Sequence, residues 1–190
     1  MPGSKLIVIS APSGSGKTTI VRESLKRHPE ILFSVSATTR PKREFEVHGK
    51  DYFFITKEEF KRKIQNDELV EWEQLYGDYY GTLRSEVDRA LRSGKSMLFD
   101  VDVNGALSIR AQYPKETVLI FIKPPSMEIL TQRLMKRGTE TLETIRTRLE
   151  RVPMELEKEN EFHFCVVNDD LQTATDEVDR IIHNVQKEKK

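Results

Sequence analysis

The chain has 190 residues, a third of them charged, and its 31 acidic and 31 basic side chains cancel to a formal net charge of zero. A chain of this length is expected to form one compact unit that buries roughly 70% of its unfolded surface. Balanced charge argues against a general nucleic-acid binder, which needs excess positive charge. No apolar run approaches transmembrane length, and residues 1–4 leave no room for a signal peptide, so no membrane association is expected.

The cysteine and histidine content argues against a disulfide-bonded protein and against a metal site made of protein ligands alone. Cys165 is the single cysteine, so no intrachain disulfide can form, and a cytoplasmic location is expected. Its neighbours in Phe164–Val167 are apolar, which predicts a core thiol. The four histidines are scattered without metal-ligand spacing, so a metal site made of protein ligands alone is not expected.

The first predicted strand and helix flank a glycine-rich loop. Leu6–Ile9 are short, apolar and mostly β-branched, which predicts a buried parallel strand. Apolar residues recur at helical spacing after Lys17, which predicts a helix beginning near that residue. A strand, a glycine-rich loop and Gly-Lys-Thr at the start of a helix are typical of a phosphate-binding P-loop. The candidate nucleotide-binding residues are Ala11, Pro12, Ser13, Gly14, Ser15, Gly16, Lys17 and Thr18.

Each part of this loop has a chemical role in phosphate binding. Gly14 and Gly16 let backbone N–H groups face an anion, and the helix N-terminus adds a positive dipole end. Lys17 supplies a positive charge for β- and γ-phosphate oxygens, and the Thr18 hydroxyl suits Mg²⁺. Ala11 stands where the general pattern has glycine, which is acceptable if the backbone there needs no positive φ. The alternative is a turn of small residues with an exposed lysine.

The rest of the chain alternates between short strands and helices. Further strands are predicted at 31–36, 51–55, 69–76, 97–100, 118–122 and 164–167, and helices at 57–66, 84–92, 104–112, 127–137, 142–160 and 170–185. Pro153 predicts a kink in the helix that contains it, and Gly77 with Asp78 indicates a turn without a long strand after it. The alternation predicts an α/β fold, a parallel sheet with helices on both faces. Residues 33–82 and 126–160 break the rhythm and are interpreted as two insertions.

Asp100 ends the apolar strand predicted at 97–100. This is where P-loop proteins hold Mg²⁺ through a second carboxylate, so Asp100 joins Thr18 as a candidate metal ligand. The alternative is an aspartate that caps the turn from strand to helix, although Asp102 and Asn104 are better placed as caps.

Two sets of arginines are candidate phosphate ligands. Arg133 and Arg137 lie four residues apart on one predicted helix, and Arg148 follows on the next. Such guanidinium groups can neutralise the charge of a transferring phosphoryl group, but they can equally be solvated helix faces. Arg40 and Arg43 form the second set, beside Tyr52, Tyr79 and Tyr80 in the predicted insertion. Two phosphate sites favour a kinase over a hydrolase; the alternative is an exposed basic loop beside core tyrosines.

Eight segments of the chain together form a specific pattern: Ser10–Thr18, Phe33–Arg40, Val47–Tyr52, Glu71–Trp72, Gly77–Thr82, Asp100–Asp102, Arg137–Glu140 and Val167–Asp170. With these segments in this order, the chain resembles the guanylate kinase family over nearly its whole length. The resemblance implies a P-loop NTPase-type core (residues 1–32, 83–125 and 161–190), an inserted GMP-binding subdomain (33–82) and a helical lid (126–160). It also implies ATP-dependent phosphorylation of GMP, or dGMP, with Mg²⁺, a step in guanine nucleotide recycling.

The resemblance also assigns residues to the acceptor nucleotide. Glu71 would accept hydrogen bonds from guanine N1–H and its 2-amino group, which adenine cannot offer. Without the resemblance, Glu71 and Glu73 could be two solvent-facing positions that alternate with Trp72. The substrate-binding set that the resemblance implies is Ser36, Arg40, Arg43, Tyr52, Glu71, Tyr80, Gly81, Thr82 and Asp102. Asn168 would lie beside the donor adenine, although Asn168-Asp169-Asp170 also makes a good helix cap.

The expected reaction is a direct phosphoryl transfer without a covalent enzyme intermediate. Lys17 and Mg²⁺ hold ATP, while Arg133, Arg137 and Arg148 close over the transferring group. The expected partners are ATP and GMP or dGMP, with no obligate protein partner. Two rivals stay open: a catalytically inactive, peptide-binding scaffold domain of the same family, and a kinase for another monophosphate or a nucleoside. Asn104, where many relatives have glutamine, has no assigned role.

Overall fold

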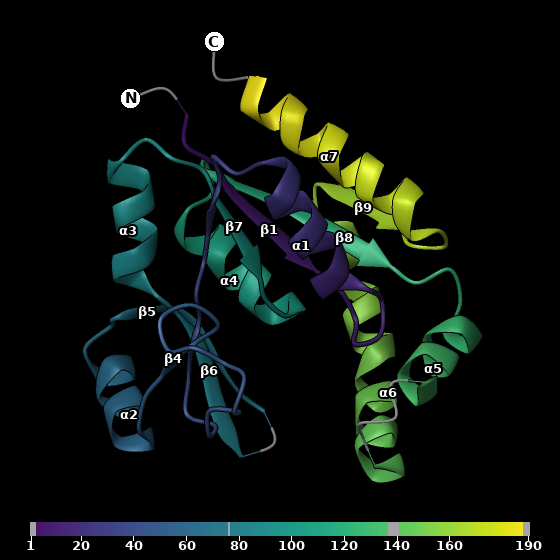
Figure 1. Cartoon of the computed structure of the whole chain (residues 1–190), viewed down its shortest axis with the longest axis horizontal. Helices are drawn as coiled ribbons and strands as arrows, with labels where there is room; N and C mark the ends of the chain where they lie inside the picture. Colours follow the sequence, from purple (N-terminus) through teal and green to yellow (C-terminus); the bar gives the residue numbers. More distant parts are fainter. Residues whose placement is uncertain (1–2, 76, 137–140, 188–190) are drawn as a thin grey trace.

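The computed structural model describes residues 3–75, 77–136 and 141–187 (Figure 1). Its central sheet has the strand order β2-β7-β1-β8-β9, and all neighbouring strands are parallel. The strands are β1 (Leu6–Ser10), β2 (Leu32–Phe33), β7 (Met97–Asp100), β8 (Thr117–Lys123) and β9 (Phe164–Val167). Every residue of β1 is buried, because β7 and β8 flank this central strand. The predicted parallel sheet is confirmed.

Helices cover both faces of the central sheet, as predicted. The helices α1 (Lys17–Arg27) and α7 (Leu171–Lys187) pack on one face, and α3 (Arg84–Arg92) and α4 (Val103–Gln112) pack on the other (Figure 1). Side chains alternate along a strand, so Ile7 and Ile9 join the first apolar cluster and Leu6 and Val8 join the second. The fold is therefore an α/β sandwich of three layers.

A second sheet lies in the first predicted insertion. Its order is β4-β3-β6-β5, from the strands β3 (Ala37–Thr38), β4 (Phe53–Phe54), β5 (Leu69–Leu75) and β6 (Asp78–Leu83). The helix α2 (Lys57–Gln65) begins after Thr56, whose side chain accepts a hydrogen bond from the Glu59 N–H (3.1 Å). Phe60 of α2 is fully buried against Ala37 and Leu69, so the helix closes one face of this sheet.

The second predicted insertion is helical. The helices α5 (Met127–Lys136) and α6 (Leu142–Glu157) share a small core of Leu130, Leu134, Ile145 and Val152, and a 3₁₀ turn, η1 (Lys158–Glu161), follows. Figure 1 shows that this pair and the second sheet both extend from the end of the central sheet that lies away from the chain termini. None of the helices in the described ranges is long and apolar enough to cross a membrane.

Several predicted elements need correction. The strands predicted at 31–36 and 51–55 shrink to two residues each, and β6 forms a six-residue strand where only a turn was expected. Pairing with β5 and β3 stabilises β6, and no local pattern reveals that pairing. Cys165 is exposed rather than in the core, because β9 is an edge strand whose buried residue is Val166. Pro153 lies inside α6.

Candidate functional site

The predicted P-loop joins β1 to α1 at the carboxyl end of the central strand. Gly14 and Gly16 have φ values of +93° and +89°, which residues other than glycine rarely adopt. Among the described residues, Asp67 is the only non-glycine with positive φ, so Ala11 does not need glycine's freedom, as expected. The Ser15 N–H donates to the carbonyl of Pro12 (3.1 Å), which tightens the turn before α1.

Lys17 and Thr18 both contact the carboxylate of Asp100. The Lys17 ammonium lies 2.7 Å from one oxygen of Asp100 and donates to the main-chain oxygen of Val101 (2.6 Å). The Thr18 hydroxyl donates to the other Asp100 oxygen (3.3 Å). The sheet brings these residues together, because Asp100 at the end of β7 pairs in register with Ile9 of β1.

The pair of Thr18 and Asp100 offers oxygen ligands of the kind that hard divalent cations prefer. Thr18 is exposed, and the Asp100 side chain keeps about a fifth of its surface accessible. Within the described ranges, no group of three or more histidine, cysteine, aspartate or glutamate side chains could hold a metal ion by itself. A cation here would therefore need further oxygens from a ligand or water.

Asn168 holds the backbone of the P-loop through a hydrogen bond. It is almost fully buried, and its side-chain amide donates to the main-chain oxygen of Ser15 (2.7 Å). Arg133 of α5 donates in turn to the main-chain oxygens of Asn168 (2.9 Å) and Asp169 (3.3 Å). The predicted capping segment 168–170 does cap α7, through Asp170, whose carboxylate accepts from the Thr173 N–H (2.8 Å).

The three arginines predicted to close over the transferring group are placed differently from one another. Arg148 of α6 donates to the hydroxyl of Ser13 (2.7 Å) and thereby brings a guanidinium from the second insertion onto the P-loop. Arg133 instead donates its hydrogen bonds to the main-chain carbonyls of Asn168 and Asp169, next to the P-loop. Arg137 lies outside the described residues.

A cavity of about 420 Å³ joins the P-loop to the second sheet. Its lining includes all eight P-loop residues together with Ser36, Tyr52, Glu71, Tyr80, Gly81, Asp100, Asp102 and Arg148. Five other predicted residues are not part of this lining: Arg40, Arg43, Thr82, Arg133 and Asn168. Most of the predicted donor and acceptor residues therefore share one cavity, although they come from distant parts of the sequence.

Glu71 of β5 points into this cavity. Its side chain accepts a hydrogen bond from the Thr82 hydroxyl (2.6 Å), while the neighbouring Trp72 is 48% exposed on the opposite face. The alternative of a solvent-facing Glu71 is therefore wrong. Burial, with a smaller contribution from nearby Asp102, raises the pKa of Glu71 to about 7. A buried carboxylate that titrates near neutrality, beside a P-loop, is typical of a binding or catalytic site.

Gly81 has a packing role in this arrangement. A side chain on Gly81 would begin 2.7 Å from the main-chain oxygen of Glu71 and 3.1 Å from the Phe60 ring. Only glycine lets β6 approach β5 closely enough to place Thr82 beside Glu71. Asn104, which had no assigned role, is exposed and accepts a hydrogen bond from Lys158 (2.5 Å).

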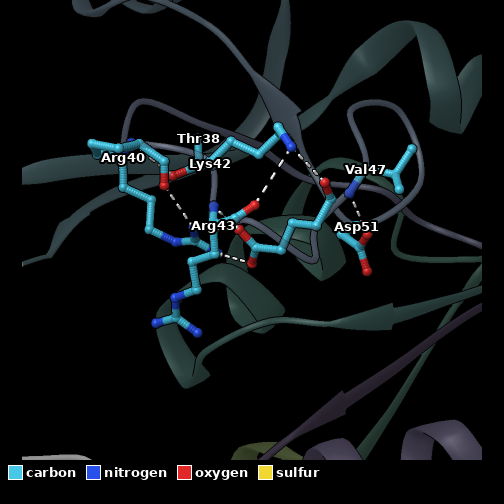
Figure 2. A network of polar contacts seen from close by, with 8 residues as sticks. Thr38, Arg40, Lys42, Arg43, Val47 and Asp51 are labelled. Atoms are coloured by element: carbon cyan, nitrogen blue, oxygen red, sulfur yellow. Dashed lines mark hydrogen bonds and ion pairs between the residues drawn. The ribbon is translucent and has the colours of Figure 1, made fainter.

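Arg40 is held by a residue that the sequence did not single out. Both carboxylate oxygens of Glu46 contact the Arg40 guanidinium, one of them at 2.7 Å, and Glu46 also accepts from the Arg43 N–H (2.8 Å). Lys42 donates to the main-chain oxygen of Glu46 (2.9 Å). Figure 2 shows Arg40, Lys42 and Arg43 within this network of polar contacts. The bond to Arg40 lowers the pKa of Glu46 to about 2, so this carboxylate stays ionised.

Arg40 is also stacked on aromatic rings. Its guanidinium carbon lies 5.0 Å from the centre of the Tyr52 ring, and the rings of Tyr52 and Tyr80 meet edge to face at 6.2 Å. The tyrosines line the cavity, and Arg40 stands directly behind Tyr52. The Arg43 side chain is exposed. The predicted basic loop thus becomes an ordered cluster, with Glu46 at its centre.

Sequence reasoning missed Glu46, Glu73, Arg151 and Glu155. The last three line the same cavity as Glu71. Glu73 left a usable signal, because residues two apart on a strand share a face. For the others, a single sequence contains no pattern that separates them from the many surface charges of the chain.

A larger hollow of about 670 Å³ lies along α3, away from the predicted site. Its basic side chains are already matched by acidic ones: Lys63 lies 2.9 Å from Glu68, and Arg84 lies 3.0 Å from Asp67. These pairs leave the charge of this hollow compensated, so it offers less to an anionic ligand than the P-loop does.

The chain is similar to known proteins over most of its length. The family profile described as guanylate kinase matches residues 3–185. The guanylate kinase of Thermotoga maritima is 47% identical over 180 residues, which cover 95% of this chain and 86% of the relative. That of Chlorobium chlorochromatii is 46% identical over 183 residues, 96% of each chain.

A solved structure shows the same fold. The crystal structure of guanylate kinase from Anaplasma phagocytophilum superposes with a TM-score of 0.78 at 31% identity, over 99% of this chain and 87% of that one. The profile match and the identities extend over nearly the whole chain, including the P-loop and the second sheet. This chain belongs to the guanylate kinase family.

Proposed function

We propose that this protein transfers the γ-phosphoryl group of ATP to GMP, or to dGMP, and releases ADP and the nucleoside diphosphate. The observation that carries this proposal is the single cavity bordered by the P-loop on one side and by the buried carboxylate of Glu71 on the other. A P-loop alone fits many nucleotide-binding proteins, whereas a second site facing it fits a kinase with a nucleotide acceptor.

The three parts of the chain have distinct roles in this proposal. The core (residues 1–32, 83–125 and 161–190) binds ATP, the subdomain at 33–82 binds GMP, and the lid at 126–160 closes over both. The second sheet and the α5–α6 pair support this division, because each has an apolar cluster of its own.

On the donor side, Lys17 and the backbone of the P-loop hold the phosphates of ATP. Thr18 and Asp100 would hold Mg²⁺, whose remaining ligands are water and phosphate oxygens, as this ion prefers. When bound, the ion neutralises negative charge on the phosphates. Asn168 keeps Ser15 and Gly16 in place through its hydrogen bond to the Ser15 carbonyl.

On the acceptor side, Arg40, Arg43, Tyr52 and Tyr80 hold the GMP phosphate. Ionised Glu71, oriented by Thr82, accepts hydrogen bonds from guanine N1–H and the 2-amino group. Adenine has no donor at N1 and no 2-amino group, so it would leave the carboxylate buried and unpaired. Ser36 and Asp102 complete the acceptor set.

In the transfer step, a GMP phosphate oxygen attacks the γ-phosphorus of ATP in line and ADP leaves. Lys17 and the lid arginines Arg133, Arg137 and Arg148 stabilise the charge on the transferring group. The attacking oxygen is already ionised at neutral pH, so no general base is required. The contact between Arg148 and Ser13 supports a role for this arginine at the donor phosphates.

Steady-state assays with ATP, Mg²⁺ and each of GMP, dGMP, AMP, CMP and UMP test the proposal. We expect ADP release with GMP and dGMP and, with the other monophosphates, kcat/KM values lower by at least about two orders of magnitude. Equal activity on AMP would contradict the assigned role of Glu71. A folded protein without turnover on any monophosphate would reject the proposed reaction.

A further inference from the structure

Arg151 of α6 contacts carboxylates from three parts of the chain. Its guanidinium lies 2.7 Å from Glu73 on β5, 3.7 Å from Asp102 at the start of α4, and 3.8 Å from Glu155 one turn further along α6. The Arg151 side chain is only 28% exposed, so water screens these interactions incompletely. The contacts link the lid helix to the acceptor strand and to the core.

Glu73 belongs to the same surface as Glu71. The two side chains are separated by Trp72, which points the other way, and both line the cavity. Asp102 lies beside both carboxylates: a side chain on Gly105 would begin 2.9 Å from an oxygen of Asp102 and also 2.9 Å from an oxygen of Glu71. Burial, with a smaller contribution from Asp102, raises the pKa values of both Glu71 and Glu73.

The balance of charge in this cluster depends on Arg151. One oxygen of Glu73 and one of Asp102 are buried and accept no hydrogen bond from an N–H or O–H of the described residues. When they are ionised, Glu71, Glu73, Asp102 and Glu155 repel one another unless a cation lies among them. Lys17, which also lines the cavity, is paired with Asp100. Arg151 contacts three of the four carboxylates and therefore compensates the charge of this cluster.

We propose that Arg151 is a positioning residue for the acceptor nucleotide, which pairs with Glu73 and so holds the β5 strand, with Glu71, against Asp102 and the lid helix. This inference rests on the proposed function and adds a residue to it. Arg151 acts on guanine through Glu73 and Glu71 rather than by touching the transferring phosphoryl group. Its loss should therefore weaken GMP binding and leave the binding of ATP intact.

Single and double substitutions should affect the pair of Arg151 and Glu73 differently. Removing one partner leaves the other charge half-buried and uncompensated, whereas removing both costs less. The variant Arg151→Gln should therefore be more harmful than Glu73→Gln combined with Arg151→Gln. Arg151→Lys keeps the charge and should retain most of the function.

The same helix supplies a matched control. Arg146 pairs with Glu150 (3.2 Å), but their side chains are 84% and 64% exposed. Such surface pairs contribute little, so Arg146→Gln should behave like the wild type. Any general effect of removing an arginine from α6 will appear in both variants.

The experiment measures kcat and both KM values for the wild type and for the variants R151Q, R151K, R146Q and E73Q/R151Q. We expect R151Q to raise the KM for GMP about tenfold and to leave the KM for ATP unchanged. E73Q/R151Q and R151K should recover GMP binding to within about threefold of the wild type. Thermal melting of each variant establishes that it is folded; should R151Q fail to fold, R151K and the double variant are compared with R146Q instead.

A second measurement does not depend on catalysis. Trp72 is the single tryptophan of the chain and lies between Glu71 and Glu73, so its fluorescence reports on the acceptor strand during GMP titration without ATP. We expect the GMP dissociation constant of R151Q to rise in parallel with its KM.

Three outcomes would overturn the inference. R151Q could match R146Q in its KM for GMP, the double variant could fail to recover, or kcat could fall with both KM values unchanged. The last outcome would place Arg151 at the transferring group instead. Failure of the proposed function looks different, because the wild type itself would then show no turnover with GMP.

Discussion

The side-chain amide of Asn168 donates a hydrogen bond of 2.7 Å to the main-chain oxygen of Ser15 and thereby occupies the space beside Gly16. The Cβ atom of any other residue at position 16 would overlap with the side-chain amide nitrogen of Asn168. The loop between β9 and α7 thus supports the P-loop and requires glycine at position 16 for a steric reason as well as for its φ of +89°.

The first prediction concerns this contact. Gly16→Ala should raise the dissociation constant for ATP at least about tenfold, because the loop must shift to relieve the overlap with Asn168. Gly94→Ala is the control, since Gly94 has a φ of +70° but nothing within 4 Å. It should cost about 1 kcal/mol of stability and leave ATP binding unchanged. Calorimetric titration and thermal unfolding check both variants; equal ATP affinity in the two would refute the steric argument.

The second prediction concerns Lys17, which lies 2.7 Å from Asp100. Lys17→Ala should reduce kcat by about two to three orders of magnitude, as the loss of a preorganised charge at a transferring group does. Far-UV circular dichroism should remain that of the wild type. Lys26→Ala, which removes an exposed lysine from the same helix, is the control. Wild-type turnover by Lys17→Ala would contradict the assignment of the P-loop.

The third prediction concerns the pH dependence of GMP binding. Burial raises the pKa of Glu71 to about 7, and guanine needs the ionised carboxylate. The GMP dissociation constant should therefore rise by up to about tenfold for each pH unit below 7 and level off above pH 8. Calorimetry in buffers of different ionisation enthalpy should detect proton release on binding at pH 6. An affinity that stays constant from pH 5.5 to 8 would remove Glu71 from the base site.

The same pKa has a consequence for stability. The pKa of Glu71 in the folded protein lies above its ordinary value of 4.5, so the protonated form favours folding. This contribution is complete below pH 4.5 and is lost as the pH rises through 7. Between pH 4.5 and pH 7, the wild type should therefore lose about 3 kcal/mol of its free energy of unfolding relative to Glu71→Gln, which has no carboxyl group at this position. Urea unfolding at several pH values measures the difference.

The fourth prediction separates phosphate binding from base binding. Glu46→Gln removes the carboxylate that holds Arg40, so GMP affinity should fall several-fold while guanosine affinity stays unchanged. Because the pKa of Glu46 is lowered to about 2, the effect should be the same from pH 5 to 8. Glu44→Gln, two residues away and exposed, is the control. Equal losses for GMP and guanosine would show that Glu46 supports the whole subdomain instead.

The fifth prediction concerns the divalent metal. Chelation with EDTA should abolish turnover without unfolding the protein or weakening GMP binding, because Thr18 and Asp100 lie on the donor side of the cavity. Asp100→Asn should raise the Mg²⁺ concentration needed for half-maximal activity. Asp67→Asn is a suitable control, since asparagine tolerates the positive φ of position 67. Undiminished turnover in excess EDTA would exclude a metal requirement.

Local signals in the sequence were sufficient to predict the elements at the core of this fold. The strand at Leu6–Ser10, the glycine loop and the helix from Lys17 follow one another directly, so their spacing alone predicts a P-loop. The strand that ends at Asp100 was also predicted with its correct bounds. Its position beside β1 then brings Asp100 to Lys17.

The second sheet could not be predicted to the same extent. Alternation along Leu69–Leu75 identified a strand but left open whether Glu71 faces solvent, and the structure shows Glu71 buried and Trp72 48% exposed. The buried face of this strand carries polar side chains such as Glu71, which accepts from Thr82, so apolar periodicity does not identify it. Contacts such as that between Arg151 and Glu73 join residues far apart in the chain, and no local pattern encodes them.

The position of β1 at the centre of the sheet constrains the synthesis of this protein. Leu6–Ser10 leave the ribosome before their partners on either side, which are Met97–Asp100 and the strand that ends at Lys123. At about 5–20 residues per second, the nascent strand waits roughly 5–20 s for the first of these neighbours. A ribosome that stalls before β8 therefore carries an apolar strand with an open edge, which a chaperone would have to shield.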